Sequence, residues 1–114
     1  MLNLSVKQKY FDAIKTGIKT VEGRLNSPKF KDLKATMQMS FTCADSQEQL
    51  ICIVQDVQTY PTFEAMLEAQ GVVNMLPGID SLPVAVAIYE SFPGYREDVK
   101  KMGALAIKIK VLSK

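Results

Sequence analysis

The sequence predicts an α+β fold in which a small, curved, mostly antiparallel sheet closes toward a barrel and helices cover its ends. Two patterns support this class. Short stretches that alternate apolar and polar residues, typical of strands, are interleaved with segments of helical spacing. The expected strands are too short and too rich in charge for a parallel sheet covered on both faces. The 114 residues suffice for a single core, so we expect one domain over residues 1–114.

The first helix follows a short apolar strand at the N-terminus. Ser5 and Gln8 have the spacing of a capping box, which predicts that the helix begins there. Val6, Tyr10, Ala13 and Ile14 follow at helical spacing, and Tyr10 and Phe11 are expected to pack into the core. Gly17 is well placed to end the helix in the left-handed conformation.

Three strands are expected after this helix. Thr20–Asn26 is the first, and a lysine-rich loop over residues 27–34 follows it. Ala35–Thr42 and Leu50–Thr59 are the other two, and the polar residues between them suit a hairpin connection.

The second half of the chain is expected to hold two helices and a last strand. Thr62 is a suitable cap for a helix that Gly71 closes. Ser81–Ser91 is predicted to be helical after a loop over residues 74–80. Gly103–Leu112 alternates clearly and predicts the final strand, which gives the order β-α-β-β-β-α-α-β.

The predicted strand over residues 20–26 carries the most informative side chains. Because side chains alternate along a strand, Thr20, Glu22 and Arg24 share one face and the apolar residues between them face the other way. Lys19 lies at the entrance of this strand. Such a cluster suits a phosphate, a nucleotide or a polar carbonyl. The alternative is a solvated strand face whose ion pairs contribute little to stability.

The composition excludes several kinds of catalytic site. There is no histidine, so Ser-His or Cys-His nucleophile pairs and histidine-ligated metals are impossible. Catalysis would have to use lysine, carboxylate, hydroxyl or tyrosine chemistry. Cys43 and Cys52 match no zinc or redox motif and are expected to be buried, reduced thiols. We expect neither a metal nor a cofactor.

Charge is distributed unevenly along the chain. Residues 1–43 hold eight Lys or Arg against three Asp or Glu, whereas residues 44–95 hold seven acidic residues and no basic one. If the basic first and last segments meet in space, they form a face that attracts phosphates, which favours RNA as a partner. No apolar run is long enough for a membrane, and the N-terminus does not look like a secretory signal, so a cytoplasmic location is expected.

The whole chain, from Leu4 to Ile109, resembles an ASCH domain, a small relative of the PUA fold. The run Gly17, Lys19, Thr20, Glu22 and Arg24 is the most specific part of the resemblance. One departure lies at residues 34–36, where many relatives have Gly-Asp. The other positions that carry the resemblance are Tyr10, Phe11, Ile14, Tyr60, Phe63, Met66, Leu67, Leu76, Pro77, Gly78, Ile88, Tyr89, Tyr95 and Gly103.

The resemblance implies a PUA-like β-barrel with a cleft that binds RNA or a nucleotide-like small molecule. Arg24 would hold a phosphate or carbonyl with its fork of donors, and Lys19 would supply a point charge. Glu22 would orient Lys19 or accept a hydrogen bond from a base edge. Tyr60 and Tyr89 are candidates for stacking on a base, with packing in the core as the alternative for each.

The resemblance also implies an enzymatic alternative, since some bacterial relatives are amidohydrolases that act on N4-acetylcytidine or a similar acylated nucleoside. Lys19 matches the lysine of their pattern, but Glu22 stands where they have a threonine. Thr20 would then be the nucleophile. Glu64 or Glu68 would have to replace the third member, a glutamate. RNA cleavage is the weaker possibility because a general acid is not evident.

A third class is a protein-interaction module that uses the acidic middle segment. The sequence leaves the oligomeric state open.

Overall fold

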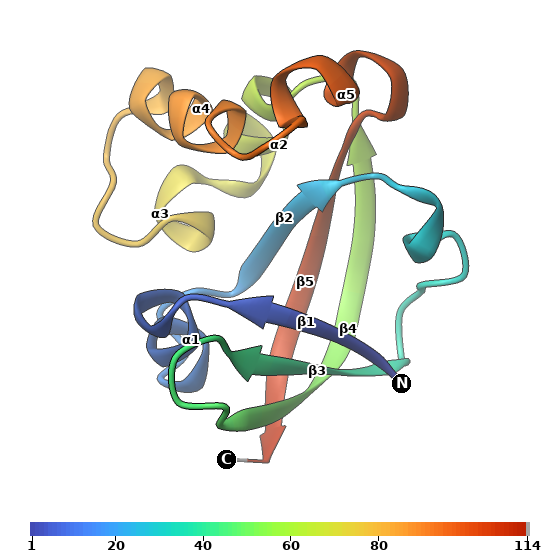
Figure 1. Ribbon diagram of the computed structural model, residues 1–114, viewed down its shortest axis with the longest axis vertical. Helices are drawn as coiled ribbons and strands as arrows, with labels where there is room; N and C mark the ends of the chain where they lie inside the picture. The colour runs from blue at the N-terminus through green and yellow to red at the C-terminus, as the bar shows by residue number, and fades with distance from the viewer. Residues whose placement is uncertain (114) are drawn as a thin grey trace.

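Five strands form one mixed sheet in the computed structural model, which describes residues 1–113 (Figure 1). The sheet order is β1-β3-β4-β5-β2. The strands are β1 (Leu2–Val6), β2 (Val21–Leu25), β3 (Gln38–Cys43), β4 (Gln49–Tyr60) and β5 (Ala104–Ser113). The helices are α1 (Gln8–Lys15), α2 (Phe63–Gln70), α3 (Val72–Met75), α4 (Leu82–Glu90) and α5 (Tyr95–Met102), and Pro28–Phe30 forms a 3₁₀ turn.

The sheet curls into a half-barrel whose two outer strands are β1 and β2. β1 pairs with β3 in parallel, and the other three pairs are antiparallel. The expected hairpin between β3 and β4 is present. A side chain links the two outer strands, because Arg24 Nη2 of β2 donates to the backbone oxygen of Ser5 in β1 at 3.1 Å. The α+β class and the mostly antiparallel, barrel-like sheet are thus confirmed.

The core has two parts that meet at β5. On one face of this strand Leu105, Ile107 and Ile109 point into the half-barrel, where α1 also packs. On the other face Ala104 and Ala106 contact the layer of helices α2 to α5, which covers one end of the sheet (Figure 1). The small alanines allow this layer to approach the strand closely. β5 therefore separates two apolar clusters, and the pairing of β2 with β5 places β2 along the same boundary.

Three expectations about local structure are wrong. The loop expected from residue 74 begins later, because helix α3 takes in residues 72–75. The capping box of Ser5 and Gln8 does not form, because β1 continues to Val6 and Lys7 is the N-cap of α1. The Gln8 amide instead donates to Asp12 Oδ1 at 2.9 Å. Helix α5 was not anticipated either: it begins directly after the Pro93-Gly94 turn and fills the segment before the last strand.

Other local signals are confirmed. Thr62 caps α2 by accepting a hydrogen bond from the Ala65 N–H at 3.0 Å, and Gly71 follows that helix. Gly17 has φ +82° just after α1. At the departure over residues 34–36, the strand starts late, at Gln38, and Thr36 adopts φ +77°, a left-handed conformation that glycine accommodates more easily. Both cysteines are buried and not disulfide-bonded.

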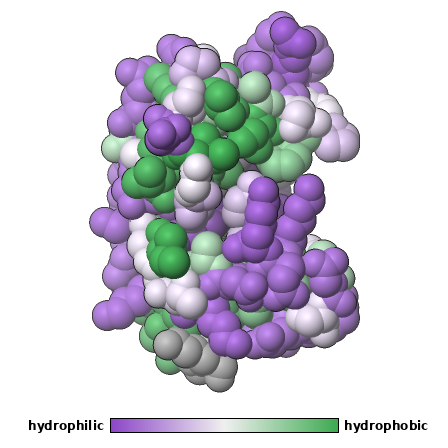
Figure 2. Space-filling model, turned by 90° about the vertical axis from the view of Figure 1, so that its left-hand side faces the viewer, coloured by the Kyte–Doolittle hydropathy of each residue, from purple (hydrophilic) through white to green (hydrophobic). Residues whose placement is uncertain are grey.

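The helical layer leaves some apolar side chains in contact with solvent. Figure 2 shows hydrophobic residues gathered over the upper half of one face and hydrophilic residues over the lower half. Val73 of α3 and Val84 of α4 are among the exposed apolar residues, with 56% and 48% of their surface accessible. Among the described residues, none of the helices is both long and apolar enough to cross a bilayer.

Candidate functional site

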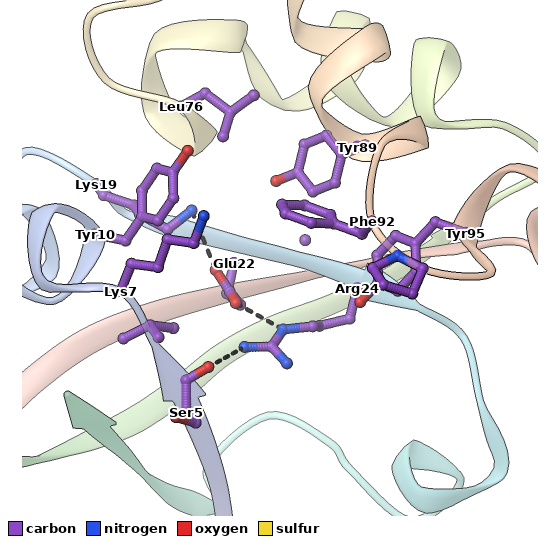
Figure 3. Close-up of a pocket in the computed structure, with 13 residues that line it drawn as sticks. Ser5, Lys7, Tyr10, Lys19, Glu22, Arg24, Leu76, Tyr89, Phe92 and Tyr95 are labelled. Atoms are coloured by element: carbon purple, nitrogen blue, oxygen red, sulfur yellow. Dashed lines mark hydrogen bonds and ion pairs between the residues drawn. The ribbon is translucent and has the colours of Figure 1, made fainter. Parts of the chain in front are cut away.

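A cleft of about 320 Å³ opens between the two outer strands, the start of α1 and the turn that joins α4 to α5. Figure 3 shows its lining. Lys19, Glu22 and Arg24 form its polar floor, and we call these three the ion triplet. The side chains of Tyr10, Phe92, Tyr95, Tyr89 and Leu76 form the walls, and Ser5 and Lys7 lie at the rim. The structure thus brings together the three charged residues predicted from the sequence.

The ion triplet is held by short, largely buried contacts. Glu22 Oε1 lies 3.1 Å from Lys19 Nζ, and Glu22 Oε2 lies 2.7 Å from Arg24 Nε. The exposed fractions of the three side chains are 2% for Lys19, 8% for Glu22 and 20% for Arg24. Exposure therefore rises toward Arg24, and the glutamate connects a fully covered cation to one that faces the cleft.

The ammonium group of Lys19 has no N–H donor left for a ligand. Its ammonium donates to the backbone oxygen of Val21 at 3.0 Å, to that of Met75, and to Glu22. An ammonium has three donors, so all are used. The contact with Met75 ties β2 to the end of α3. Burial lowers the pKa of Lys19, and the attraction of Glu22 opposes this effect. Lys19 is thus a structural centre of the site rather than the free point charge that the resemblance implies.

Glu22 is the acceptor at the centre of the floor. Burial alone would raise its pKa, but the charges of Lys19 and Arg24 outweigh burial and hold the pKa of this carboxyl below its usual range. An ionised carboxylate only accepts hydrogen bonds, and each of its oxygens can accept more than one. Glu22 therefore retains acceptor capacity toward the cleft after binding both cations.

Arg24 is the donor of the floor. Its Nε binds Glu22, and Nη2 binds the backbone oxygen of Ser5 across the gap between the outer strands. A guanidinium carries five N–H groups, so three remain for a ligand or solvent beyond these contacts within residues 1–113. Acceptor and donor thus lie side by side at the bottom of the cleft.

Tyr89 contributes its hydroxyl to the cleft, not the face of its ring. The ring stacks on Phe63 with centroids 5.2 Å apart and meets Phe92 edge-on at 6.0 Å. Tyr89 is only 3% exposed, and its hydroxyl points toward the cleft (Figure 3). Burial raises the pKa of the phenol, so it remains protonated. The expectation of base stacking is therefore wrong for Tyr89, because Phe63 is stacked on its ring and the residue is almost fully buried.

Gly23 makes the position of Tyr89 possible. A Cβ atom at residue 23 would lie 2.5 Å from the Tyr89 hydroxyl and 2.8 Å from Met75 Cε. These distances are well inside van der Waals contact. The glycine between Glu22 and Arg24 thus lets the phenol reach the floor from the helical layer.

Four residues predicted as site candidates lie outside the cleft. The Tyr60 hydroxyl accepts a hydrogen bond from Gln70 Nε2 at 2.8 Å, and its ring packs with the helical layer beside α5. Thr20 lines a shallow groove with residues 14–17, and its backbone joins Asn74 and Ile109. Glu64 and Glu68 project from α2 as exposed residues and do not line the cleft.

Sequence reasoning missed several lining residues. Tyr10 was expected only in the core, but its ring borders the cleft and lies 5.5 Å from Lys19 Nζ. Lys7, exposed at the rim, precedes α1, and Phe92 lies in the α4–α5 turn. Lys7 and Tyr10 lie at the start of a helix that leads to Lys19, and this position could have indicated that they border the site. Phe92 gave no such signal. Within residues 1–113, no group of three or more Cys, Asp or Glu is arranged to hold a metal.

Comparisons with known proteins agree with this architecture. The ASCH domain model matches residues 4–113. The crystal structure of the hypothetical protein PH0355 superposes with a TM-score of 0.84 at 31% identity and covers 97% of this chain and 98% of its own. The solution structure of PF0455 from Pyrococcus furiosus gives 0.77 at 28% identity, with 99% and 98% covered.

A more distant structure supports the fold alone. A mutant of ZmASCH from Zymomonas mobilis superposes with a TM-score of 0.62 at 14% identity, over 95% of this chain and 67% of that one. This likeness agrees with the expected PUA-like fold. No curated protein matches the sequence. The family match extends over nearly the whole chain and includes the strand of the ion triplet, so the chain belongs to the ASCH domain family.

Proposed function

We propose that this protein binds RNA or a nucleotide-like ligand in the cleft. The observation that carries the proposal is the Glu22–Arg24 pair at the floor of a cavity with aromatic walls. A nucleobase offers flat apolar faces and a polar edge, and the cleft offers aromatic walls and adjacent acceptor and donor groups. Its volume of about 320 Å³ is at the lower end of ligand pockets, which suits one base better than a large cofactor.

The charges of the site support an anionic or strongly polar ligand. The ion triplet has one negative and two positive groups, and Lys7 adds an exposed cation at the rim. In this proposal Arg24 contacts the base or a phosphate, Lys7 supplies the point charge for the backbone, and Lys19 fixes Glu22 from behind. The role first given to Lys19 therefore passes to Lys7.

The test is a titration of fluorescein-labelled single-stranded RNA, followed by anisotropy at several salt concentrations. We expect the binding constant to fall as salt rises and to fall further in Arg24→Ala and Lys7→Ala. Lys31→Ala is the matched control, because Lys31 is an exposed lysine that borders a different depression, beside the 3₁₀ turn. Equal losses in Lys7→Ala and Lys31→Ala would show that the cleft is not the binding site.

Hydrolysis of an acylated nucleoside is the second candidate, and one observation favours it. Lys19, whose pKa burial lowers, lies beside Glu22 at the floor of the cleft. A nucleophile from the protein is harder to identify, because Thr20 lines another groove. In this candidate Glu22 would take a proton from a water molecule as the water oxygen bonds to the acyl carbon. The carbon–nitrogen bond would then break, and Glu22 would return the proton to the leaving amine as the carboxylic acid forms.

Chromatography of a reaction with N4-acetylcytidine separates the two candidates. Release of cytidine and acetate by the unaltered protein, lost in Glu22→Gln, would establish hydrolysis. Absence of turnover at high enzyme concentration, together with salt-dependent RNA binding, would leave the binding function alone.

A further inference from the structure

We propose that the cleft takes one unpaired base and reads it by its Watson–Crick edge. This inference deepens the proposed function and rests on it. Three polar groups converge on the floor and lower wall of the cleft: the carboxylate of Glu22, the guanidinium of Arg24 and the hydroxyl of Tyr89 (Figure 3). The partner must therefore supply hydrogen-bonding groups along one edge.

The floor has a fixed order of acceptor and donor. Glu22 cannot turn, because each of its oxygens is bound by a different cation. Arg24 cannot turn either, because it is bound at Nε and at Nη2. A rigid acceptor beside a rigid donor complements an N–H next to a carbonyl or ring nitrogen. Every nucleobase has that pair on its Watson–Crick edge, whereas a phosphate or a ribose does not combine them in one plane.

Tyr89 provides the third polar contact. Its ring is packed and the residue is 3% exposed, and its hydroxyl lines the cleft. A phenol hydroxyl can both donate and accept a hydrogen bond, so it can bind a polar group that enters the cleft. The gap above Gly23 directs this hydroxyl at the cleft. A base bound at Glu22 would share the cleft with this hydroxyl.

Pairing in a duplex would hide the edge that the cleft reads. In a double helix the Watson–Crick edge is already hydrogen-bonded and lies inside the stack, so a base must be single-stranded or turned out to enter a pocket. Tyr10 and Phe92 both line the cleft (Figure 3), and its volume of about 320 Å³ suits one base. The ligand class is therefore an unpaired nucleotide in a loop, a bulge or a free strand.

The first experiment compares RNA states and base edges on the unaltered protein. A labelled ten-nucleotide RNA of mixed sequence is titrated alone and annealed to its complement. Nucleoside monophosphates then compete for the site, each beside an analogue methylated on its edge: 3-methyluridine, N4,N4-dimethylcytidine or N6,N6-dimethyladenosine monophosphate. 5-Methyluridine and 5-methylcytidine monophosphates are the controls, since their methyl group lies off that edge.

We expect the duplex to bind at least about tenfold more weakly than the single strand. Edge-methylated nucleotides should compete at least about fivefold less well than their parents, while the 5-methylated controls compete normally. Equal binding of duplex and single strand, or edge methylation without effect, would overturn the inference and leave RNA binding itself in place. Failure of every RNA and nucleotide to bind would overturn the proposed function as well.

A variant pair tests the third contact without disturbing the ion triplet. Tyr89→Phe keeps the stacked ring and removes the hydroxyl, and we expect it to weaken single-strand binding about threefold to tenfold. Tyr60→Phe removes a hydroxyl outside the cleft and should bind like the parent. An unchanged affinity in Tyr89→Phe would show that the Tyr89 hydroxyl does not contact the Watson–Crick edge of the base.

Discussion

Two lysine–glutamate ion pairs have their lysines on either side of the short loop that follows α1. Only one of the two pairs lines the cleft. Lys15 Nζ and Glu48 Oε2 are 2.6 Å apart, with 37% and 45% of the side chains exposed. Lys19 and Glu22 are 3.1 Å apart and only 2% and 8% exposed. The hydrogen bond with Glu48 raises the pKa of Lys15, whereas burial lowers that of Lys19. Burial, more than distance, thus decides how an ion pair affects its members.

The comparison also distinguishes an exposed ion pair that contributes little to stability from a buried one on which the structure depends. The exposed pair joins α1 to the start of the β4 hairpin, where water can replace either partner. The buried pair has a second cation, two backbone acceptors and a cleft beside it. Removal of one member there leaves a charge that water does not reach, which is strongly unfavourable.

The largest effect is expected from Lys19→Met. This change removes the ammonium from Glu22 and leaves the carboxylate with Arg24 alone, so we expect the free energy of unfolding to fall by about 3 kcal/mol. Urea denaturation measures the loss. Lys15→Met is the matched variant in the exposed pair and should keep the parental midpoint. Similar losses in both variants would contradict the distinction between the pairs.

A smaller effect is expected from Gly23→Ala. The added methyl group would overlap Tyr89 and Met75, and overpacking of this kind costs about 1–3 kcal/mol. Urea denaturation gives the change in stability, and near-ultraviolet circular dichroism follows the tyrosine environment. The double variant with Tyr89→Phe should regain part of the loss, because the shortest overlap is with the hydroxyl. Without any such recovery, another contact must limit residue 23.

Acid should weaken the protein through Glu22. Its folded-state pKa is lowered by Lys19 and Arg24 against the effect of burial, so the unfolded chain takes up the proton first as the pH falls. The stabilisation is complete above the ordinary glutamate pKa and is lost as the pH falls through the lower, folded-state value. Urea denaturation at stepwise lower pH should show this decline, and Glu22→Gln should flatten it. A parallel decline in Glu22→Gln would assign the effect to other carboxyls.

The smallest effect is expected from Glu48→Gln. The exposed pair is screened by salt, so its loss should not move the urea midpoint measurably at either low or high ionic strength. A clear shift at low salt that disappears at high salt would show that this pair also contributes to stability.

Local chemistry explains which elements the sequence could predict. The Thr62 cap, the glycine after α1 and the alternation of the last strand depend on neighbours within a few residues. The same holds for Glu22 and Arg24, which share one face of a short strand, and for Lys19, which lies two residues before it. The capping box failed because β3 pairs with residues 2–6 and extends β1 past Ser5. Tertiary pairing there overrode a local preference.

The walls of the cleft could not be predicted in this way. Tyr10, Phe92 and Tyr95 come from three elements that meet only when the helical layer packs on the sheet. Tyr60 and Tyr89 looked alike in the sequence, yet the hydroxyl of one binds Gln70 and that of the other reaches the floor past Gly23. Thr20 and Lys19 are adjacent and both border the groove beside residues 14–17, but only Lys19 also lines the cleft. Such differences depend on contacts between distant segments.

The hydrogen bond between Arg24 and Ser5 holds the two outer strands of the half-barrel together. The half-barrel ends at β1 and β2, and the Arg24 side chain forms a hydrogen bond across the gap between them. The same guanidinium faces the cleft, so a ligand that draws it inward competes with the backbone of β1. Ligand binding in the cleft should then change how often β1 opens locally. We expect the hydrogen-exchange rates of the backbone amides in residues 2–6 to change when a ligand binds.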